Sequence, residues 1–263
     1  MKYKLIAADM DGTLLNDKLE LTERTKNAII GAVEAGALFV TATGRPFKGI
    51  GIINDHITAD MPFIIFNGAA IVMGKSKEVL FRKQLDFSLV KEVYALSMDR
   101  GIPLVLWTEL LWGNSECKAT IGYKKYFGLE MQIIENIDDF EDEFIYKLIW
   151  FGTPDVISRF QSEMQDHFRG RLNCHTSLPV YLEFVGLDAE KGSAMAELGR
   201  IYGIDRSEMI AIGDGYNDVS MLKYAGLGIA MENAPDAIKA TCDEVTLSNN
   251  SDGVAAVIEK YIL

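Results

Sequence analysis

The chain has little cysteine and histidine, and it has no uninterrupted apolar run long enough to cross a bilayer. The three cysteines, Cys117, Cys174 and Cys242, are widely spaced without a CxxC pair, which indicates neither a disulfide scaffold nor a zinc knuckle. The three histidines lack metal-ligand spacing and no Gly-x-Ser-x-Gly elbow occurs, which argues against a histidine metal site and a serine hydrolase. The apolar stretch before Asp9 is too short for a signal-peptide core, so we expect a cytoplasmic protein.

Positive charge is scarce relative to negative charge. The 263 residues include 38 acidic and 26 basic side chains, which gives a formal charge of −12. Such a surface repels phosphate backbones and anionic lipid headgroups at long range, so we expect neither nucleic acid nor a membrane as a partner. A local basic pocket could still hold a small anion. Because 49% of the residues are hydrophobic, a sizeable folded core is expected, whereas the oligomeric state is not determined by the sequence.

Three short apolar segments in the first part of the chain each end in a small polar turn. They are predicted to be buried strands, at Tyr3–Ala8, Leu38–Thr41 and Phe63–Phe66. A helix is predicted between the first two, with Thr22 as its N-cap and Gly36 as its stop. Buried strands that alternate with helices predict a parallel sheet, in which ligands bind beyond the carboxyl ends of the strands.

The same alternation returns near the C-terminus, whereas the middle of the chain has a different pattern. The C-terminal elements are expected as helix, strand, helix and strand at Ser193–Tyr202, Met209–Ile212, Asn217–Tyr224 and Leu227–Ala230. In the middle, helices or strands are expected at Phe87–Arg100, Pro103–Trp107, Ile145–Phe151, Asp155–Phe168, Arg171–His175 and Val180–Phe184. This pattern predicts an α+β domain at residues 84–183, inserted into a core formed by residues 1–83 and 184–263.

Four aspartates follow predicted strands and are candidates for a metal site. Asp9 and Asp11 are two residues apart, so an extended backbone would point both carboxylates to one side. Asp214 and Asp218 follow a later strand and would join the first pair if the two strands are neighbours. Carboxylates packed together need a compensating cation, which favours a hard metal such as Mg²⁺. The alternatives are a solvated loop or a calcium loop, but Leu14 stands where a calcium loop needs glycine.

Other polar residues at the predicted strand ends could bind an anion. Thr43 offers a hydroxyl and Gly44 a backbone amide after the second strand. Lys191 opens a predicted helix, where its ammonium and the helix dipole would both favour a phosphate. Asn67, after the third strand, could orient a carboxylate or a ligand. For each of these, an ordinary turn or a solvated side chain is the alternative.

Taken in order, these segments resemble the four motifs of the haloacid dehalogenase superfamily. The matching segments are Asp9-Met10-Asp11-Gly12-Thr13, Thr43-Gly44-Arg45, Lys191 and Gly213-Asp214-Gly215-Tyr216-Asn217-Asp218. The insert is similar to the cap of the Cof-like branch, and the likeness covers essentially the whole chain. It implies an α/β fold with a Rossmann-like, doubly wound parallel-sheet core and an inserted α+β cap that sets substrate specificity.

The resemblance implies a magnesium-dependent phosphatase for small phosphorylated metabolites, with sugar phosphates as the expected substrates and flavin or pyridoxal phosphates as alternatives. Asp9 would attack phosphorus and form an aspartyl-phosphate, and Asp11 would protonate the leaving alcohol and then activate water. Thr43, Gly44 and Lys191 would hold the phosphoryl oxygens.

The resemblance also implies the metal ligands. They would be the Asp9 side chain, the main-chain carbonyl of Asp11 and the Asp214 side chain, with Asn217 and Asp218 orienting that shell or ligating through water. Arg45 could be structural or contact the substrate. Tyr216 departs from the family pattern, since relatives often carry glutamate there, and we expect little effect.

Two other functions remain open at this point. A phosphohexomutase would use the same aspartate, but it needs cap arginines to hold a second phosphate, and Arg100, Arg159, Arg169 and Arg171 form no visible cluster. A sugar-phosphate-binding regulator without turnover would lack Asp9 or Asp11, and both are present. The candidate cap residues for contact with a sugar are Trp107, Trp112, Asn114, His175 and Glu183. The alternatives are that the aromatic residues belong to the core of the insert and that Glu183 lies at the linker.

Overall fold

The structure is a computed structural model that describes residues 2–176 and 178–263. The chain divides into two compact units. The core unit comprises the residues up to Arg82 together with Asp188–Leu263, and the insert unit comprises Lys83–Leu187. Within the described residues, no helix is long and apolar enough to cross a membrane.

The core unit is built on an eight-stranded sheet with the strand order β14-β13-β12-β1-β2-β3-β4-β5. The strands from β14 to β3 are parallel, whereas β4 and β5 pair antiparallel at one edge. The strands are Leu5–Asp9 (β1), Leu38–Ala42 (β2), Pro62–Ile65 (β3), Ala70–Met73 (β4), Val79–Arg82 (β5), Met209–Gly213 (β12), Leu227–Ala230 (β13) and Glu244–Val245 (β14). The predicted α/β class with a parallel sheet is thus confirmed.

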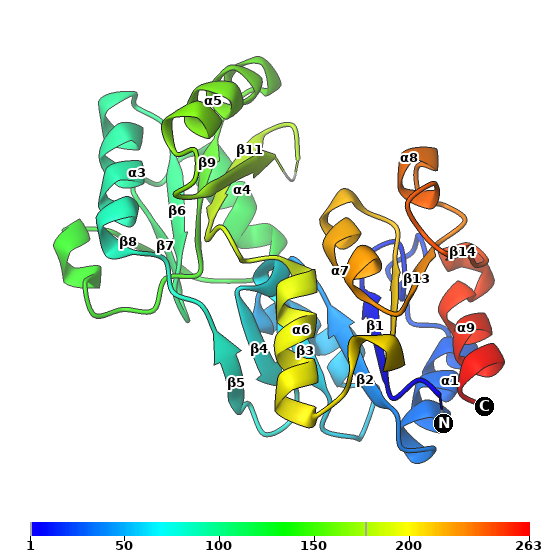
Figure 1. Cartoon of the computed structure of the whole chain (residues 1–263). Helices are drawn as coiled ribbons and strands as arrows, with labels where there is room; N and C mark the ends of the chain where they lie inside the picture. The colour runs from blue at the N-terminus through cyan, green and yellow to red at the C-terminus, as the bar shows by residue number, and fades with distance from the viewer. Residues whose placement is uncertain (1, 177) are drawn as a thin grey trace. The chain divides into compact units, whose positions relative to one another are not determined.

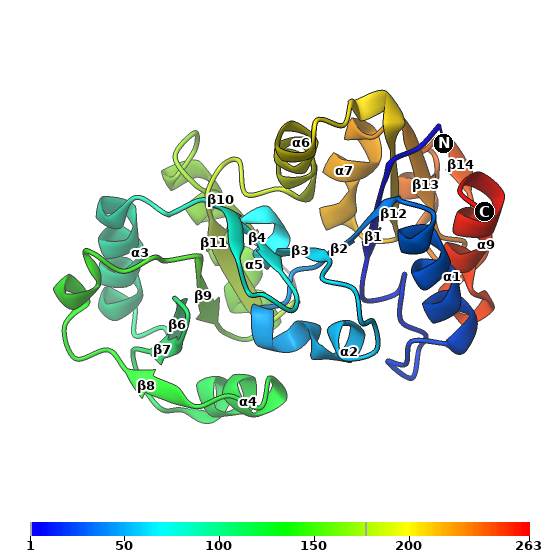
Figure 2. The same cartoon turned by 90° about the horizontal axis from the view of Figure 1, so that it is seen from below.

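Helices cover both faces of this sheet, which explains why its central strands are apolar on both sides. Figure 2 shows α6 and α7 on one face and α1 and α9 on the other. The helices are Glu23–Glu34 (α1), Gly51–Asn54 (α2), Lys191–Tyr202 (α6), Val219–Tyr224 (α7), Asp236–Lys239 (α8) and Gly253–Tyr261 (α9). The 3₁₀ turns are Phe47–Ile50 (η1), Phe66–Gly68 (η2), Arg206–Glu208 (η4), Tyr216–Asp218 (η5) and Asn249–Ser251 (η6). Thr22 caps α1 as predicted, because its hydroxyl accepts from the Thr25 N–H at 3.2 Å.

The strand register brings the ends of the central strands to the same level. Ala8 of β1 pairs with Ile212 of β12 on one side and with Thr41 of β2 on the other. Thr41 in turn pairs with Phe63 of β3. The residues that follow these strands therefore leave the sheet at one common edge, where parallel α/β proteins bind their ligands.

The insert unit has a six-stranded sheet with the order β10-β11-β9-β6-β7-β8 and extends from cyan to yellow-green in Figure 1. Its strands are Leu104–Trp107 (β6), Leu111–Gly113 (β7), Met131–Ile133 (β8), Lys147–Phe151 (β9), Asn173–Thr176 (β10) and Tyr181–Val185 (β11). Its helical segments are Phe87–Asp99 (α3), Lys118–Tyr126 (α4), Ile137–Phe140 (η3) and Pro154–His167 (α5). The sheet packs against α3 and α5 through a core that includes Leu104, Leu148 and Trp150.

Candidate active site

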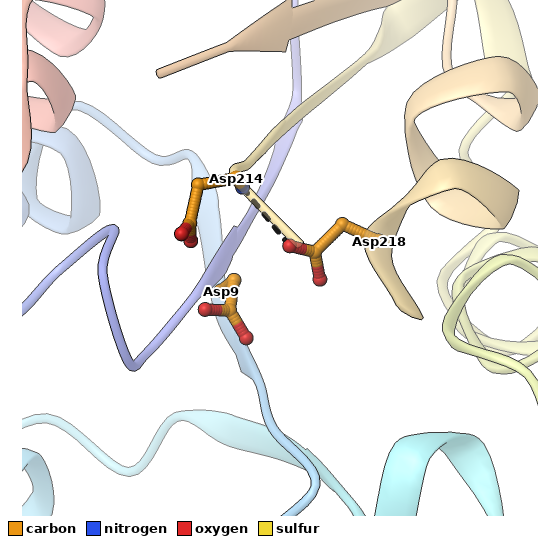
Figure 3. Close-up of side chains that lie close together, drawn as sticks. All are labelled: Asp9, Asp214 and Asp218. Atoms are coloured by element: carbon orange, nitrogen blue, oxygen red, sulfur yellow. Dashed lines mark hydrogen bonds between the residues drawn. The ribbon is translucent and has the colours of Figure 1, made fainter. Parts of the chain in front are cut away.

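Three aspartates converge at the carboxyl edge of the core sheet. Asp9 ends β1, Asp214 follows β12 directly, and Asp218 ends the turn η5. One carboxylate oxygen of each lies within 4.8 Å of the others. Figure 3 shows the carboxylates of Asp214 and Asp218, which come from one turn, both facing that of Asp9. The structure therefore brings together three of the four aspartates predicted as metal-site residues.

Lys191 supplies the positive charge next to this cluster. It is the first residue of α6 and its side chain is fully buried. Its Nζ lies 2.5 Å from Oδ1 of Asp9 and 2.6 Å from Oδ1 of Asp218. Burial alone would lower the pKa of this ammonium, but the charges of Asp218 and Asp9 outweigh burial and raise it. Lys191 therefore bridges the carboxylates of Asp9 and Asp218 with its ammonium group.

The cluster has more carboxylates than the one ammonium can compensate. Burial raises the pKa of Asp9 well above its usual value, and the neighbouring Asp218 carboxylate raises it further. Burial also raises the pKa of Asp214. When all three are ionised, the carboxylates exceed the one ammonium by two negative charges, and a divalent, oxygen-binding cation such as Mg²⁺ fits the residues present because it would offset this excess.

Asp218 organises the turn that follows β12. Its Oδ2 accepts hydrogen bonds from the backbone N–H groups of Asp214 at 3.0 Å and Gly215 at 2.8 Å. Its Oδ1 is held by Lys191. Because protein donors hold both oxygens of Asp218, this geometry favours an orienting role for its carboxylate over direct contact with a metal.

Asp11 does not join the cluster with its side chain. Arg45 holds the Asp11 carboxylate in a bidentate ion pair, with Nε 2.9 Å from Oδ2 and the terminal nitrogen 2.5 Å from Oδ1. Arg45 also donates to the carbonyl of Gly49 at 3.4 Å. The guanidinium of Arg45 is therefore engaged by an acid of the first motif and by the backbone, which is the structural role among the two that the sequence left open.

The other predicted anion-binding residues lie at the same edge of the sheet. Thr43 is buried after β2, and its hydroxyl accepts from the backbone N–H of Arg45 at 3.1 Å. The Asn67 side chain accepts from Nδ2 of Asn217 at 3.0 Å, which connects the turn after β3 to η5. Gly44 is packed against Asn67, since a Cβ there would lie 3.0 Å from the amide oxygen.

The turn after β3 is strained where it meets α6. Phe66, Asn67 and Gly68 all have positive φ, of 50°, 58° and 108°. A Cβ on Gly68 would lie 2.3 Å from the carbonyl oxygen of Glu190, the residue before Lys191. This close approach requires glycine, and it fixes the start of α6 against the strand edge.

Two residues that the sequence reasoning missed also contact the cluster. The Thr13 hydroxyl donates to Oδ1 of Asp214 at 2.8 Å. The side-chain amide of Asn233, after β13, donates to the carbonyl of Gly12 at 2.8 Å. A signal for Asn233 existed, because β13 is one more strand of the parallel sheet that ends in a polar turn.

In the insert unit, two of the residues predicted to contact a sugar have partners within their own unit. Asn114 accepts from the Leu104 N–H and donates to the carbonyl of Ile102, both at 2.9 Å. The indole N–H of Trp112 donates to the hydroxyl of Thr108 at 3.2 Å. These contacts give Asn114 and Trp112 roles in the fold of the unit.

The other three predicted residues belong to one face of the insert sheet. Glu183 forms a buried ion pair with Lys147 across β11 and β9, at 2.9 Å. Burial lowers the pKa of His175, while the charge of Glu183 acts in the opposite direction. Trp107 donates from its indole N–H to the hydroxyl of Tyr123 at 3.1 Å. Charged and aromatic groups therefore share this face.

Comparisons with known proteins agree with these features. A family model described as haloacid dehalogenase-like hydrolase matches residues 6–258. YwtE of Bacillus subtilis (strain 168), named 5-amino-6-(5-phospho-D-ribitylamino)uracil phosphatase, is 32% identical over 98% of this chain and 98% of its own. YcsE of the same strain carries the same activity name and is 29% identical over 99% of this chain and 96% of its own. A solved haloacid dehalogenase-like hydrolase from Bacteroides thetaiotaomicron superposes with a TM-score of 0.88 at 30% identity, covering 98% of this chain and 99% of that one.

The chain belongs to the haloacid dehalogenase-like hydrolases, because both the family model and full-length relatives match it. The resemblance of its four motifs to that superfamily is confirmed. Within the family, the chain falls in the class of phosphoric monoester hydrolases, since relatives that align along its whole length are phosphatases.

Proposed function

We propose that this protein is a magnesium-dependent phosphatase that hydrolyses small phosphorylated metabolites, sugar phosphates foremost, through a covalent aspartyl-phosphate. The observation that carries the proposal is the convergence of Asp9, Asp214 and Asp218 around the buried ammonium of Lys191. Such a site offers a nucleophilic carboxylate beside groups that hold both a divalent cation and a phosphate.

Asp9 is the proposed nucleophile. It lies at the end of a rigid central strand, where its carboxylate is held by Lys191 at 2.5 Å. Its side-chain oxygen attacks phosphorus in line and the bond to the leaving alcohol breaks, which gives the aspartyl-phosphate. Lys191, Thr43 and the backbone amide of Gly44 bind the transferring oxygens, and the amide of Asn217 orients them from η5.

Asp11 is the proposed acid and base. As an acid it gives a proton to the leaving alcohol, and as a base it takes one from the water that hydrolyses the intermediate. Arg45 holds both carboxylate oxygens of Asp11 in the structure, so this ion pair must open before Asp11 can face the leaving group of a substrate. Arg45 is then available to contact the substrate.

A metal ion would be held by the Asp9 and Asp214 carboxylates and the main-chain carbonyl of Asp11, with Asp218 orienting this set through its bonds to the 214–215 backbone. When bound, Mg²⁺ would supply neutralisation of negative charge between Asp9 and the phosphate. The carboxylate donors and the excess negative charge support this assignment.

The insert unit, predicted at residues 84–183, is proposed as the cap that selects the substrate. Support comes from the face with the Lys147–Glu183 pair, His175 and Trp107, whose charged and aromatic groups suit a polyhydroxylated leaving group. YwtE and YcsE are named for a substrate with a phosphorylated ribityl chain, which is a polyol.

The mutase alternative finds no support among the insert arginines. Arg100 pairs with Glu163 at 2.7 Å and Arg171 with Glu92 at 2.8 Å, and Arg169 pairs with Asp166. Arg159 packs over the ring of Phe160. The three arginines with acidic partners are thus engaged by carboxylates rather than gathered for a second phosphate. A cytoplasmic location is also part of the proposal, supported by three cysteines that are free thiols.

The test is phosphate release from a panel of sugar, nucleotide and cofactor phosphates, with and without magnesium. The parent chain is compared with Asp9→Asn and with Asp205→Asn, which alters a carboxylate that caps the turn η4 away from the cluster. We expect magnesium-dependent release by the parent and the control, and none by Asp9→Asn although its circular dichroism is unchanged.

The intermediate is tested separately. Acid quenching of Asp11→Asn during turnover of p-nitrophenyl phosphate should trap phosphate on the protein, because this leaving group departs without a proton whereas the variant is slow to activate water. No release from any compound by the parent chain with magnesium would overturn the phosphatase proposal. Retained turnover in Asp9→Asn would overturn Asp9 as the nucleophile.

A further inference from the structure

We propose that Asn233 is a positioning residue for the metal-binding carboxylate of Asp214, an inference that rests on the proposed function. Asn233 lies in the turn after β13, and its side-chain amide connects three turns that are distant in sequence. These are the turn after β1, the turn after β12 and the segment that enters η6.

Both ends of the Asn233 amide are used. Nδ2 donates to the carbonyl of Gly12 at 2.8 Å and lies 3.5 Å from Oδ2 of Asp214. Oδ1 accepts from the backbone N–H of Asn249 at 3.0 Å. The amide group therefore has a fixed orientation, with its donor side directed toward the residues of the proposed metal site.

Asp214 is confined from two sides. The Thr13 hydroxyl holds Oδ1 at 2.8 Å, and the amide of Asn233 approaches Oδ2. Gly12 passes so close that a Cβ there would lie 2.5 Å from Oδ2. A carboxylate held in this way presents its remaining lone pairs in one direction, which is how outer-shell partners orient a metal ligand.

Asn249, whose backbone N–H donates to Oδ1 of Asn233, is itself held in place by hydrogen bonds. Asn249 is buried, and its Nδ2 donates to the carbonyl of Leu15 at 3.1 Å and to Oδ1 of Asp17 at 3.0 Å. Asn233 thus connects the cluster to an amide network anchored on the 15–17 backbone. Although the residue itself is exposed, its amide is held at both ends.

The experiment measures magnesium binding by calorimetry without substrate, and then phosphate release as a function of magnesium. Asn233→Ala removes the amide, and Asn233→Leu removes it while keeping a branched side chain with the same number of non-hydrogen atoms. The matched control is Asn250→Ala, which loses contacts with Asp17 at 2.8 and 3.1 Å but touches neither Gly12 nor Asp214 in the structure. Urea unfolding of each variant checks that it is folded.

We expect both Asn233 variants to bind magnesium about tenfold more weakly, in line with the effect of outer-shell ligand partners. The turnover number at saturating magnesium should stay close to that of the parent, because the nucleophile is untouched. Asn250→Ala should bind magnesium like the parent.

Unchanged magnesium affinity in the Asn233 variants would overturn this inference alone. Equal weakening in Asn250→Ala would also overturn it, since the effect would then come from the loop as a whole. A parent chain that binds no magnesium and releases no phosphate would overturn the proposed function and this inference together.

Discussion

Replacing Lys191 with methionine would leave the buried carboxylates of the core unit without their counter-charge. Methionine nearly keeps the volume of the side chain, so the change removes mainly the ammonium. Lys191 and Asp218 are fully buried and Asp9 is 6% exposed, so water cannot take over the lost interaction. Removing one partner of a buried ion pair costs about 3–5 kcal/mol, and we expect that loss in the free energy of unfolding.

The repulsion left behind supports this magnitude. The closest oxygens of Asp9 and Asp218 lie within 4.8 Å of each other. At an effective dielectric constant of about 20, two unit charges at that separation repel by roughly 3 kcal/mol. The parent chain offsets this repulsion with one ammonium placed between the two carboxylates.

The assay is urea unfolding followed by circular dichroism and by tryptophan fluorescence. All three tryptophans, Trp107, Trp112 and Trp150, lie in the insert unit, so fluorescence reports on that unit and circular dichroism on both. We expect the variant to lower the midpoint of the core-unit transition and to leave the fluorescence transition unchanged. Lys223→Met, an exposed lysine of α7, is the matched control and should have little effect.

The loss of unfolding free energy in Lys191→Met should depend on pH, because Asp9 can bind a proton in the folded state. The folded-state pKa of Asp9 is raised, so the folded protein binds this proton more tightly than the unfolded chain does. Such a group destabilises the fold as pH rises through its folded pKa, and Lys191→Met should raise that pKa further. The deficit should therefore shrink as pH falls, and millimolar magnesium should reduce it at neutral pH. A deficit below about 1 kcal/mol at neutral pH would refute the reasoning from buried charge.

Two further changes test other parts of the structure. Gly68→Ala puts a Cβ 2.3 Å from the carbonyl oxygen of Glu190 at a φ of 108°, so we expect the free energy of unfolding to fall by about 1–3 kcal/mol. Phosphate release should fall as well, because Lys191 is the residue after Glu190 and would be displaced with it. Gly36→Ala has a similar φ of 90° without a clash, and should keep its activity in the same assay. Arg171 and His167 hold the pKa of Glu92 below its usual value. The interaction of Glu92 with these two residues therefore stabilises the fold at pH values above the pKa of Glu92 in the unfolded chain, and this stabilisation is lost as pH falls through the lower folded-state pKa. Glu92→Gln should therefore lower the fluorescence-detected urea midpoint at pH 7 but not below about pH 4, and an equal effect at both pH values would contradict this.

The sequence could predict the central strands of the core sheet because they are buried on both faces and are therefore continuous apolar runs. The helix after Thr22 was predictable because its capping residue is a local signal in the sequence. Within the insert, Lys118–Tyr126 was not predicted, since Gly122 and three lysines weaken its apolar pattern. The short strands at Leu111–Gly113 and Met131–Ile133 were missed because a strand of three residues is too short to show a recognisable alternation of apolar and polar residues.

The candidate site also combines residues that the sequence could predict with contacts that it could not. Asp9, Asp214 and Lys191 carry a signal in the sequence, because each stands at the end of a strand or the start of a helix. The place of Asn233 after a strand carries such a signal too, but its contacts do not, since its partners Gly12 and Asn249 are 221 and 16 residues away. The pairing of Arg45 with Asp11 also depends on how the turns after β1 and β2 meet, which no local pattern specifies.

An acidic site in a protein of net charge −12 must still bind a phosphate, and the charges imply an order of events. When ionised, Asp9, Asp214 and Asp218 outnumber Lys191 by two charges, whereas Asp11 and Arg45 form an ion pair. A phosphate approaching this set alone is repelled. A divalent cation would bring the set to neutrality, and the ammonium and the hydroxyl of Thr43 could then attract the phosphoryl oxygens. Metal should therefore bind before phosphate, and the affinity of the site for inorganic phosphate should rise with the magnesium concentration.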